Sequence, residues 1–450
     1  MIRRLALPAV TAASVLAACG SWQRVGTGPE APTPEQTLTE IFDLTAVYQR
    51  LGRLVAGQPL PWVATVATAA GPGDSTLVVA GLSLENRALS FQREGDGFAA
   101  HYRVEVAFER EGATPIVVAR DETVRVATFQ ETLRADESVL FQQLFHPVPG
   151  AWTARVTVRD RRASRQTTAA APVAVPAYAP GSISAPVLAY SVTGRARRTD
   201  PLDILLNPRG TVAFGGDTLL AYVEGYGLAP GAEVPVELRD VTDSVVYRGV
   251  LAFSGGQEVE GSVLRIAPDS QPLGELTLAV GTGDARRETR ALVSFSSAWV
   301  ITNFDDMLSL LRYFGEDARV GELRRASPPA RPALWLTFYR ETDPVPITPE
   351  NEALEAYFGR IAAANQRFRD EGLPGWRTDR GEVFIGLGEP DEGFLTNPTL
   401  TEGRVIRWHY IQHRLTLYFQ DETGFGRYRL TTESRSEFER VLNRLRRQAR

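Results

Sequence analysis

Four acidic side chains lie close together in the C-terminal third of this chain of 450 residues: Asp379, Glu382, Glu389 and Asp391. Two carboxylates can act as general acid and base in hydrolysis, and several can bind Ca²⁺. Their spacing does not match an EF-hand loop. A strand expected at Val383–Leu387 would place Glu382 and Asp391 at its opposite ends. We therefore weigh a structural corner against a catalytic or metal site, and prefer the structural interpretation.

Histidines are the second candidate for chemistry, and the chain has four: His101, His146, His409 and His413. His409 and His413 have the spacing that binds one metal ion on a helix. The surrounding pattern favours a strand, where they would lie about 13 Å apart at roughly 3.3 Å per residue. We interpret them as ordinary sheet and hairpin residues. No H-E-x-x-H or G-x-S-x-G pattern occurs. The sequence predicts no metal site and no cofactor.

Composition excludes several classes of function. The chain has no lysine, so all 49 basic residues are arginine. A phosphate-binding P-loop, a pyridoxal Schiff base, a Ser-Lys nucleophile pair and a kinase site all require lysine and are excluded. One cysteine excludes disulfide frameworks and cysteine-rich zinc sites. A net charge of −5 provides no global basic field, so no nucleic-acid partner is expected.

The single cysteine lies at the end of an N-terminal targeting pattern. Basic residues at 3–4 precede an apolar run at 5–16, and the sequence Leu-Ala-Ala-Cys19-Gly20 follows. These residues resemble the lipobox of bacterial lipoproteins, in which the chain is cut before the cysteine and its thiol is lipidated. The resemblance implies a signal peptide at 1–18, acyl chains such as palmitate on Cys19, and anchoring in a bilayer. By the same resemblance, Gly20 in place of aspartate favours the outer over the inner membrane if the cell has two membranes. The alternative is an ordinary secretory signal with an incidental cysteine.

Periodicity divides the rest of the chain before residue 297. A polar, Gly/Pro-rich tether is expected at 19–36 and a short helical segment at 37–60. Short runs with period-two alternation, separated by turn residues, predict a β-sandwich over 61–160 and a second over 187–296. Both sandwiches are expected to be immunoglobulin-like. The Ala/Pro-rich stretch 161–186 between them is interpreted as an interdomain linker.

Helical and strand patterns mix after residue 297, which predicts an α+β domain over 297–450. Helices are expected at Asn303–Phe314, from a Thr348-Pro349 start, and at the arginine-rich C-terminus. The strands expected here are 333–339, 383–387, 405–411, 415–419 and 427–431.

The sequence Gly-Trp-Arg-Thr-Asp-Arg-Gly at 375–381, followed by Gly-Glu-Pro-Asp at 388–391, resembles the motif of the bacterial GWxTD domain family. The resemblance covers about residues 300–450 and implies an envelope protein with an α+β domain. The family has no assigned reaction. The motif residues are structural or binding candidates: Gly375, Trp376, Thr378, Asp379, Arg380, Gly381, Gly388, Pro390 and Asp391.

Elementary chemistry suggests roles for these residues. Gly375 can adopt the positive φ of a turn, and Trp376 can anchor a helix–sheet core. Asp379, with the threonine before it, can hold an Asx-type turn. Arg380 can pair with a carboxylate, and Gly381 is expected to start a strand.

A shorter resemblance links Gly388-x-Pro390 and Trp408-x-Tyr410 to the small lipoprotein subunit of the outer-membrane barrel assembly machine. That resemblance implies two helices on a three-stranded sheet and a domain that binds partner proteins. Together these features predict a cell-envelope lipoprotein that acts as a non-catalytic protein-binding or scaffold module. The alternative is an envelope hydrolase that uses the acidic residues around Trp376, so enzymatic activity stays open with a preference against it.

Overall fold

The computed structural model describes residues 44–134, 139–296, 300–346, 351–368, 373–395, 404–421 and 424–448. Cys19, the predicted signal peptide and the predicted tether lie outside the described residues. So do the first residues of the helix expected at 37–60 and the Thr348-Pro349 helix start. In the described part, no helix combines the length and the apolar character that crossing a bilayer requires.

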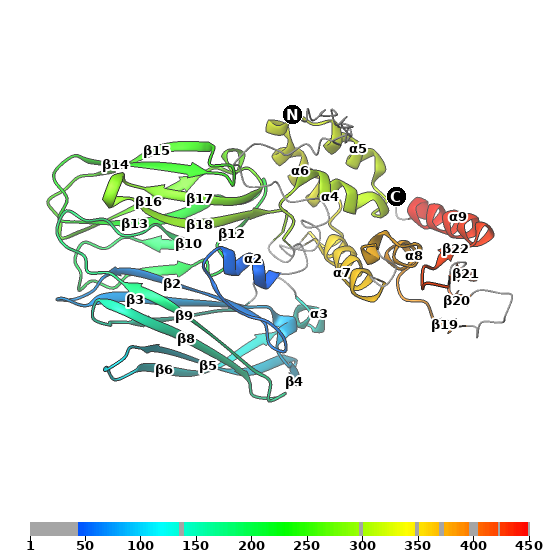
Figure 1. Ribbon diagram of the computed structural model, residues 1–450, viewed down its shortest axis with the longest axis horizontal. Coiled ribbons are helices and arrows are strands. Elements are labelled where there is room, and N and C mark those ends of the chain that lie inside the picture. Colours follow the sequence, from blue (N-terminus) through cyan, green and yellow to red (C-terminus); the bar gives the residue numbers. More distant parts are fainter. Residues whose placement is uncertain are drawn as a thin grey trace, which may run out of the picture.

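Two antiparallel sheets form the first sandwich (Figure 1). The strands of its first sheet, in spatial order, are β1 (Leu54–Ala56), β2 (Trp62–Ala70), β3 (Thr76–Leu84) and β7 (Val139–Phe145). In the second sheet, β5 pairs with β6 along one edge and with β4 and β8 along the other, and β9 pairs with β8. These strands are β4 (Gln92–Glu94), β5 (Gly97–Glu109), β6 (Ile116–Val126), β8 (Gly150–Asp160) and β9 (Gln166–Val175), and the short helix α3 (Phe129–Thr132) follows β6.

Strand β9 corrects the prediction of a partly extended interdomain linker over 161–186, because much of this stretch belongs to the first sandwich. Residues 166–175 pair with β8 along its whole length, and their side chains alternate between exposed and partly buried. Asp160 closes the connection by accepting hydrogen bonds from the backbone N–H groups of Arg162 and Ala163, at 2.9 and 3.0 Å. The sequence showed no clear alternation of apolar and polar residues here, because the segment consists largely of alanine, threonine and proline. An edge strand tolerates Pro172, because its outer edge needs no ladder donor.

The second sandwich also consists of two sheets. The strands of one sheet, in spatial order, are β11 (Asp203–Leu206), β10 (Val187–Thr193), β13 (Leu219–Tyr226) and β16 (Val259–Ile266). The strands of the other are β12 (Thr211–Ala213), β18 (Arg287–Ser294), β17 (Gly274–Val280), β14 (Ala232–Arg239) and β15 (Val245–Phe253). Only the pairing of β12 with β18 is parallel among these described strands.

The two sandwiches stack face to face, so four sheets lie in layers (Figure 1). Every residue of β3 is buried, because one face of the strand meets the first core and the other meets the second sandwich. The apolar cluster between the sandwiches contains Ala69, Leu77, Val79, Ala189, Leu202, Ile204, Leu206 and Tyr222. Helix α2 (Leu44–Arg50) packs at the same junction, where Tyr48 and Val63 lie with Leu292 of β18.

The C-terminal region combines helices with a four-stranded sheet. Its helices are α4 (Phe304–Leu310), α5 (Asp317–Arg325), α6 (Arg331–Glu341), α7 (Glu352–Arg367), α8 (Asp379–Leu387) and α9 (Thr432–Gln448). The sheet, in spatial order, consists of β19 (Glu392–Leu395), β20 (Arg404–Tyr410), β21 (Leu415–Asp421) and β22 (Arg429–Leu430). The predicted fold class is confirmed: two β-sandwiches followed by a domain of helices and antiparallel sheet.

Two predicted strands are helices. Residues 333–339 belong to α6, where Trp335 and Phe338 are buried three positions apart on one face. Residues 383–387 belong to α8, which begins after the N-cap Thr378. Both segments are short apolar runs, and such runs fit a buried helix as well as a buried strand.

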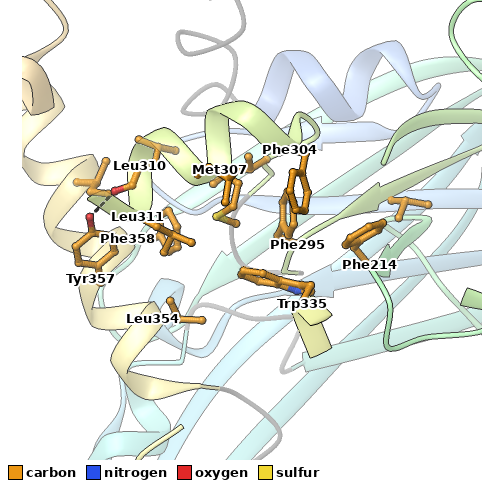
Figure 2. Close-up of a cluster of buried hydrophobic side chains, with 14 of the residues drawn as sticks. Phe214, Phe295, Phe304, Met307, Leu310, Leu311, Trp335, Leu354, Tyr357 and Phe358 are labelled. Carbon is orange, nitrogen blue, oxygen red and sulfur yellow. Dashed lines mark hydrogen bonds between the residues drawn. The ribbon is translucent and has the colours of Figure 1, made fainter. Parts of the chain in front are cut away.

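One continuous core joins the second sandwich to the C-terminal region (Figure 2). The ring of Phe295, just after β18, lies 4.6 Å from the ring of Trp335 and 5.3 Å from that of Phe214. Met307 and Leu354, from α4 and α7, extend the same cluster. The helices are therefore packed on the end of the second sandwich.

Candidate functional site

Trp376 is the buried centre of the GWxTD motif. It lies in a 3-10 turn, Gly375–Arg377, between α7 and α8, and its side chain is 1% exposed. The guanidinium carbons of Arg312 and Arg377 lie 4.6 and 4.9 Å from the centre of its ring. Its indole N–H is buried and has no hydrogen-bond partner among the described residues. Trp376 thus occupies the anchoring position expected of it, but between helices and not before a strand.

Both motif glycines allow close approach of backbone segments. A Cβ on Gly375 would lie 2.1 Å from the carbonyl oxygen of Ala364 in α7. A Cβ on Gly381 would lie 1.9 Å from the carbonyl oxygen of Gly375. The positive φ predicted for Gly375 is absent from its backbone, and Gly381 lies in the first turn of α8 instead of starting a strand.

Thr378 starts α8. Its hydroxyl accepts a hydrogen bond from the N–H of Gly381 at 3.0 Å and donates one to the carbonyl of Gly375 at 2.8 Å. The side chain is buried, so the motif threonine connects the 3-10 turn to the helix it caps.

Asp379 joins α8 to the last elements of the chain. Its carboxylate accepts the N–H of Leu430 in β22 at 2.8 Å and pairs with Arg435 of α9 at 3.2 Å. Glu382, one turn further along α8, pairs with the same guanidinium at 2.9 Å. The predicted Asx turn at Asp379 is therefore replaced by a contact that is distant in sequence.

Arg380 is buried between two aromatic rings. Its guanidinium carbon lies 5.0 Å from the ring of Phe368 and 4.7 Å from that of Tyr428. This arrangement adds cation–π contacts to the core between α7 and β22.

The residues after α8 form a separate corner. Gly388 ends the helix with a φ of 84°, and its carbonyl accepts the hydroxyl of Tyr410 at 3.0 Å. Beyond Pro390, which is partly buried, the Asp391 carboxylate accepts the N–H of Ile411 at 2.7 Å. Glu389 is exposed and pairs with Arg367 of α7.

The four acidic candidates therefore do not converge. Asp379 and Glu382 meet Arg435 near the start of α8, and Glu389 and Asp391 have other partners beyond its end. Nine helical residues span about 13 Å at 1.5 Å per residue. An acid/base pair must reach one substrate atom, and this arrangement lacks that geometry. The hydrolase interpretation requires these carboxylates to converge on one substrate, and they do not.

Two of the histidines lie beside this corner, because His409 pairs with Glu392 across the sheet and the His413 ring lies 6.3 Å from the ring of Tyr410. His409 is on β20 and His413 follows in the hairpin turn, as the sequence predicted for both. No group of three possible metal ligands occurs within the described ranges. On the first sandwich, His101 bonds to Glu94 and to Thr123 beside an open cavity of about 420 Å³.

Sequence reasoning missed the arginines around Trp376. Arg377 occupies the unspecified position of the GWxTD pattern, and Arg312 is distant in sequence, so no motif marked either one. The contact of these two arginines with the Trp376 ring depends on the tertiary packing of segments that are distant in the sequence.

The fold and this corner define a protein of stacked β-sandwiches with a C-terminal α+β domain. The model of the GWxTD domain family matches residues 280–441, so the chain contains a GWxTD domain. The match begins at the end of β17 and includes β18, earlier than the predicted start near residue 300, and it ends at 441. This range agrees with the core that Phe295 shares with the helices.

Three solved structures are similar to this chain at low sequence identity, and no curated protein matches the sequence. A biofilm-associated protein BSP domain is 7% identical, with a TM-score of 0.16, over 55% of this chain and 54% of that chain. A tetra-tandem repeat in the extending region of a large adhesion protein is 13% identical, with a TM-score of 0.16, over 52% and 50%. Dimeric latent PorU from Porphyromonas gingivalis is 14% identical, with a TM-score of 0.20, over 55% and 21%. The chain spans about half the length of the first two.

Proposed function

We propose that this protein is a lipid-anchored envelope protein whose GWxTD domain binds a protein partner without catalysis. The observation that carries the proposal is the engagement of the motif side chains inside the domain. Thr378 caps a helix, Asp379 connects α8 to β22 and α9, and Arg380 lies between two rings. These contacts hold the motif residues in fixed positions inside the domain. A protein-binding module needs a stable surface of this kind.

The stacked sandwiches support a scaffold role. Their cores are joined by the cluster around β3, and the second core continues into the helices. A chain built in this way holds the GWxTD domain at one end of a single packed unit. In an envelope, this unit holds the domain in a fixed position relative to the two sandwiches.

The lipobox resemblance supports the anchor. Cys19 is the only cysteine in the chain and lies where lipidation requires it. Residues 20–43 separate it from α2, and a fully extended chain of that length reaches at most about 86 Å. Gly20 supports sorting to the outer membrane when the cell has two membranes.

Substitutions at residues 19 and 20 test the anchor. Cys19→Ser should abolish incorporation of labelled palmitate and release the protein from membranes in a carbonate wash. Gly20→Asp is the matched variant and should keep the label while moving the protein to the inner membrane. Persistence of Cys19→Ser in the washed membrane pellet contradicts the anchor.

Crosslinking in intact cells followed by purification tests the partner. The wild-type protein should give one reproducible crosslinked protein band, and a chain truncated after residue 296, which keeps β18 in the second sandwich, should lose it. Equal crosslinking by both proteins excludes the GWxTD domain as the binding element.

A further inference from the structure

A buried carboxylate holds a turn that presents an aromatic side chain to solvent. Asp421, the last residue of β21, accepts hydrogen bonds from the N–H groups of Gly424 and Gly426, at 2.9 and 2.8 Å. Both glycines have a positive φ, of 73° and 84°, which other residue types rarely adopt. Phe425 between them is 89% exposed, the highest value among the large apolar side chains that the structure describes. The backbone on both sides of Phe425 is therefore fixed, and its ring stays outside the core.

Two further exposed apolar side chains lie at the same end of the C-terminal sheet. The last residue of β19, Leu395, lies opposite Ile406, two residues from the start of β20. That start pairs with the end of β21, since Arg404 lies opposite Asp421. Leu395 and its neighbour Phe394 are both exposed, and the whole sheet lies away from the two sandwiches (Figure 1). We call this end of the sheet the apolar tip, and its members are Phe394, Leu395 and Phe425.

The charges near the apolar tip offset one another. Three exposed arginines lie on its strands and turn: Arg404, Arg407 and Arg427. Three acidic residues accompany them in the sequence, the last two outside the described residues: Asp421, Glu402 and Glu422. Arg429 pairs with Asp379 at 3.3 Å and adds no net charge. The tip therefore has no excess of positive charge, and exposed apolar surface is what distinguishes it.

The proposed anchor gives the apolar tip access to a bilayer. Residues 20–43 connect the anchor to α2, and a chain of that length extends up to about 86 Å, which lets the molecule turn the tip toward the membrane. A bilayer interface accepts phenylalanine and leucine side chains without a preformed pocket. A protein partner would need a pocket matched to one protruding ring. The length of the tether and the shape of the tip thus favour lipid over protein.

We propose that the apolar tip inserts Phe425 and Leu395 into the interface of the phospholipid bilayer that holds the anchor. This inference rests on the proposed function, because the anchor supplies the bilayer. Insertion by apolar side chains requires neither anionic lipid nor low salt, since the tip has no positive excess to be screened. The GWxTD domain then lies at the membrane surface and meets its partner there.

Sedimentation with phosphatidylcholine vesicles tests insertion without the anchor. The full chain from residue 19, with Cys19→Ser, should sediment with these vesicles equally at about 0.1 M and about 1 M salt. Phe425→Ala in the same chain should weaken the binding by about tenfold, as the lost burial of one phenylalanine implies. Phe129→Ala is the matched control, because Phe129 is 61% exposed on α3 of the first sandwich, and should leave the binding unchanged.

A fluorophore at the ring position provides a second measurement. Cys19 is the only cysteine, so in the Cys19→Ser background Phe425→Cys and Phe129→Cys each supply one thiol for an environment-sensitive label. On addition of vesicles, emission from position 425 should shift to shorter wavelength and be quenched by brominated lipid. Emission from position 129 should stay the same.

Several outcomes overturn the insertion. These are no sedimentation with vesicles, equal binding by Phe425→Ala and Phe129→Ala, release by about 1 M salt, which would assign the binding to charge, or an unchanged emission at position 425. If Phe425→Ala keeps vesicle binding but loses the crosslinked protein band in cells, the tip is a protein contact and not a lipid contact. The carbonate wash judges the anchor separately, because it strips peripheral contacts and leaves lipidated protein in the membrane.

Discussion

Glycine is required at the two motif positions 375 and 381 because there is no space for a Cβ, and not because of a positive φ. Gly375 packs on the carbonyl of Ala364, and Gly381 packs on the carbonyl of Gly375, at distances that no Cβ tolerates. Three backbone segments therefore meet at a point where any side chain would push them apart. Trp376 lies between these glycines, so their contacts fix the position of its ring.

Alanine substitution separates this close approach from glycine's general effect on helices. Gly375→Ala or Gly381→Ala should lower the free energy of unfolding by about 3 kcal/mol, because backbone atoms must move to admit the methyl group. Gly359→Ala in α7 is the matched control, since a Cβ there meets nothing within 4 Å. That variant should gain about 0.5–1 kcal/mol. Denaturant melts of the full chain measure all three, and a neutral Gly375→Ala contradicts the close packing.

Asp379 contributes one partly buried hydrogen bond to the backbone and one charge. Asp379→Ala leaves the N–H of Leu430 without its acceptor and should cost about 1–3 kcal/mol. Asp379→Asn keeps an oxygen acceptor and loses only the charge toward Arg429 and Arg435, so it should cost less. Chemical unfolding of both variants checks the order. An equal loss in both would mean that the charge, and not the backbone hydrogen bond, carries the effect.

Among the elements, the N-cap residue explains why the segment after the motif tryptophan is a helix and not the predicted strand. The run Val383–Leu387 contains β-branched and aromatic residues, which favour a strand. Thr378, followed by Asp379 and Glu382 in the first turns, is nevertheless a helix start. The start signal prevailed because the helix buries Val383, Phe384 and Ile385 in the core.

The cap predicts a graded response in α8. Thr378→Ala removes the hydroxyl that accepts the N–H of Gly381 and should destabilise the protein by about 1–2 kcal/mol. Thr378→Ser retains that hydroxyl and should recover most of the loss. Thermal melts of the two variants provide the comparison, and a serine variant as unstable as the alanine variant would assign the loss to the methyl group.

In the whole molecule, a buried ionic network joins the two sandwiches. Arg195 pairs with Glu224 through two hydrogen bonds, at 2.8 and 2.9 Å, and both residues are buried. The hydroxyls of Tyr222 and Tyr226 donate to the two carboxylate oxygens of Glu224. Arg195 also donates to the carbonyl of Ala70 in β2, so the network crosses from the second sandwich to the first.

Glu224→Gln tests this connection between the sandwiches. Glutamine keeps the shape but leaves the charge of Arg195 uncompensated, which should cost about 3–5 kcal/mol. Glu109→Gln is the control, because its pair with Arg155 lies on the surface and should contribute about 0–1 kcal/mol. Calorimetric unfolding should show a lower transition for Glu224→Gln alone. Equal transitions for both variants would mean that solvent reaches the buried pair.

The sequence by itself determined the number of sandwiches, most strands, the helices at residues 303–314 and after 431, and the location of the motif. Period-two alternation, turn residues and the Asn303 cap are local features. They can therefore be recognised in the sequence without knowledge of tertiary contacts. It did not determine α6, α8 or β9, since short apolar or alanine-rich runs fit either element until a core selects one. Only the tertiary structure placed the arginines around Trp376, stacked the sandwiches and separated the four carboxylates, because those arrangements depend on segments distant in the chain.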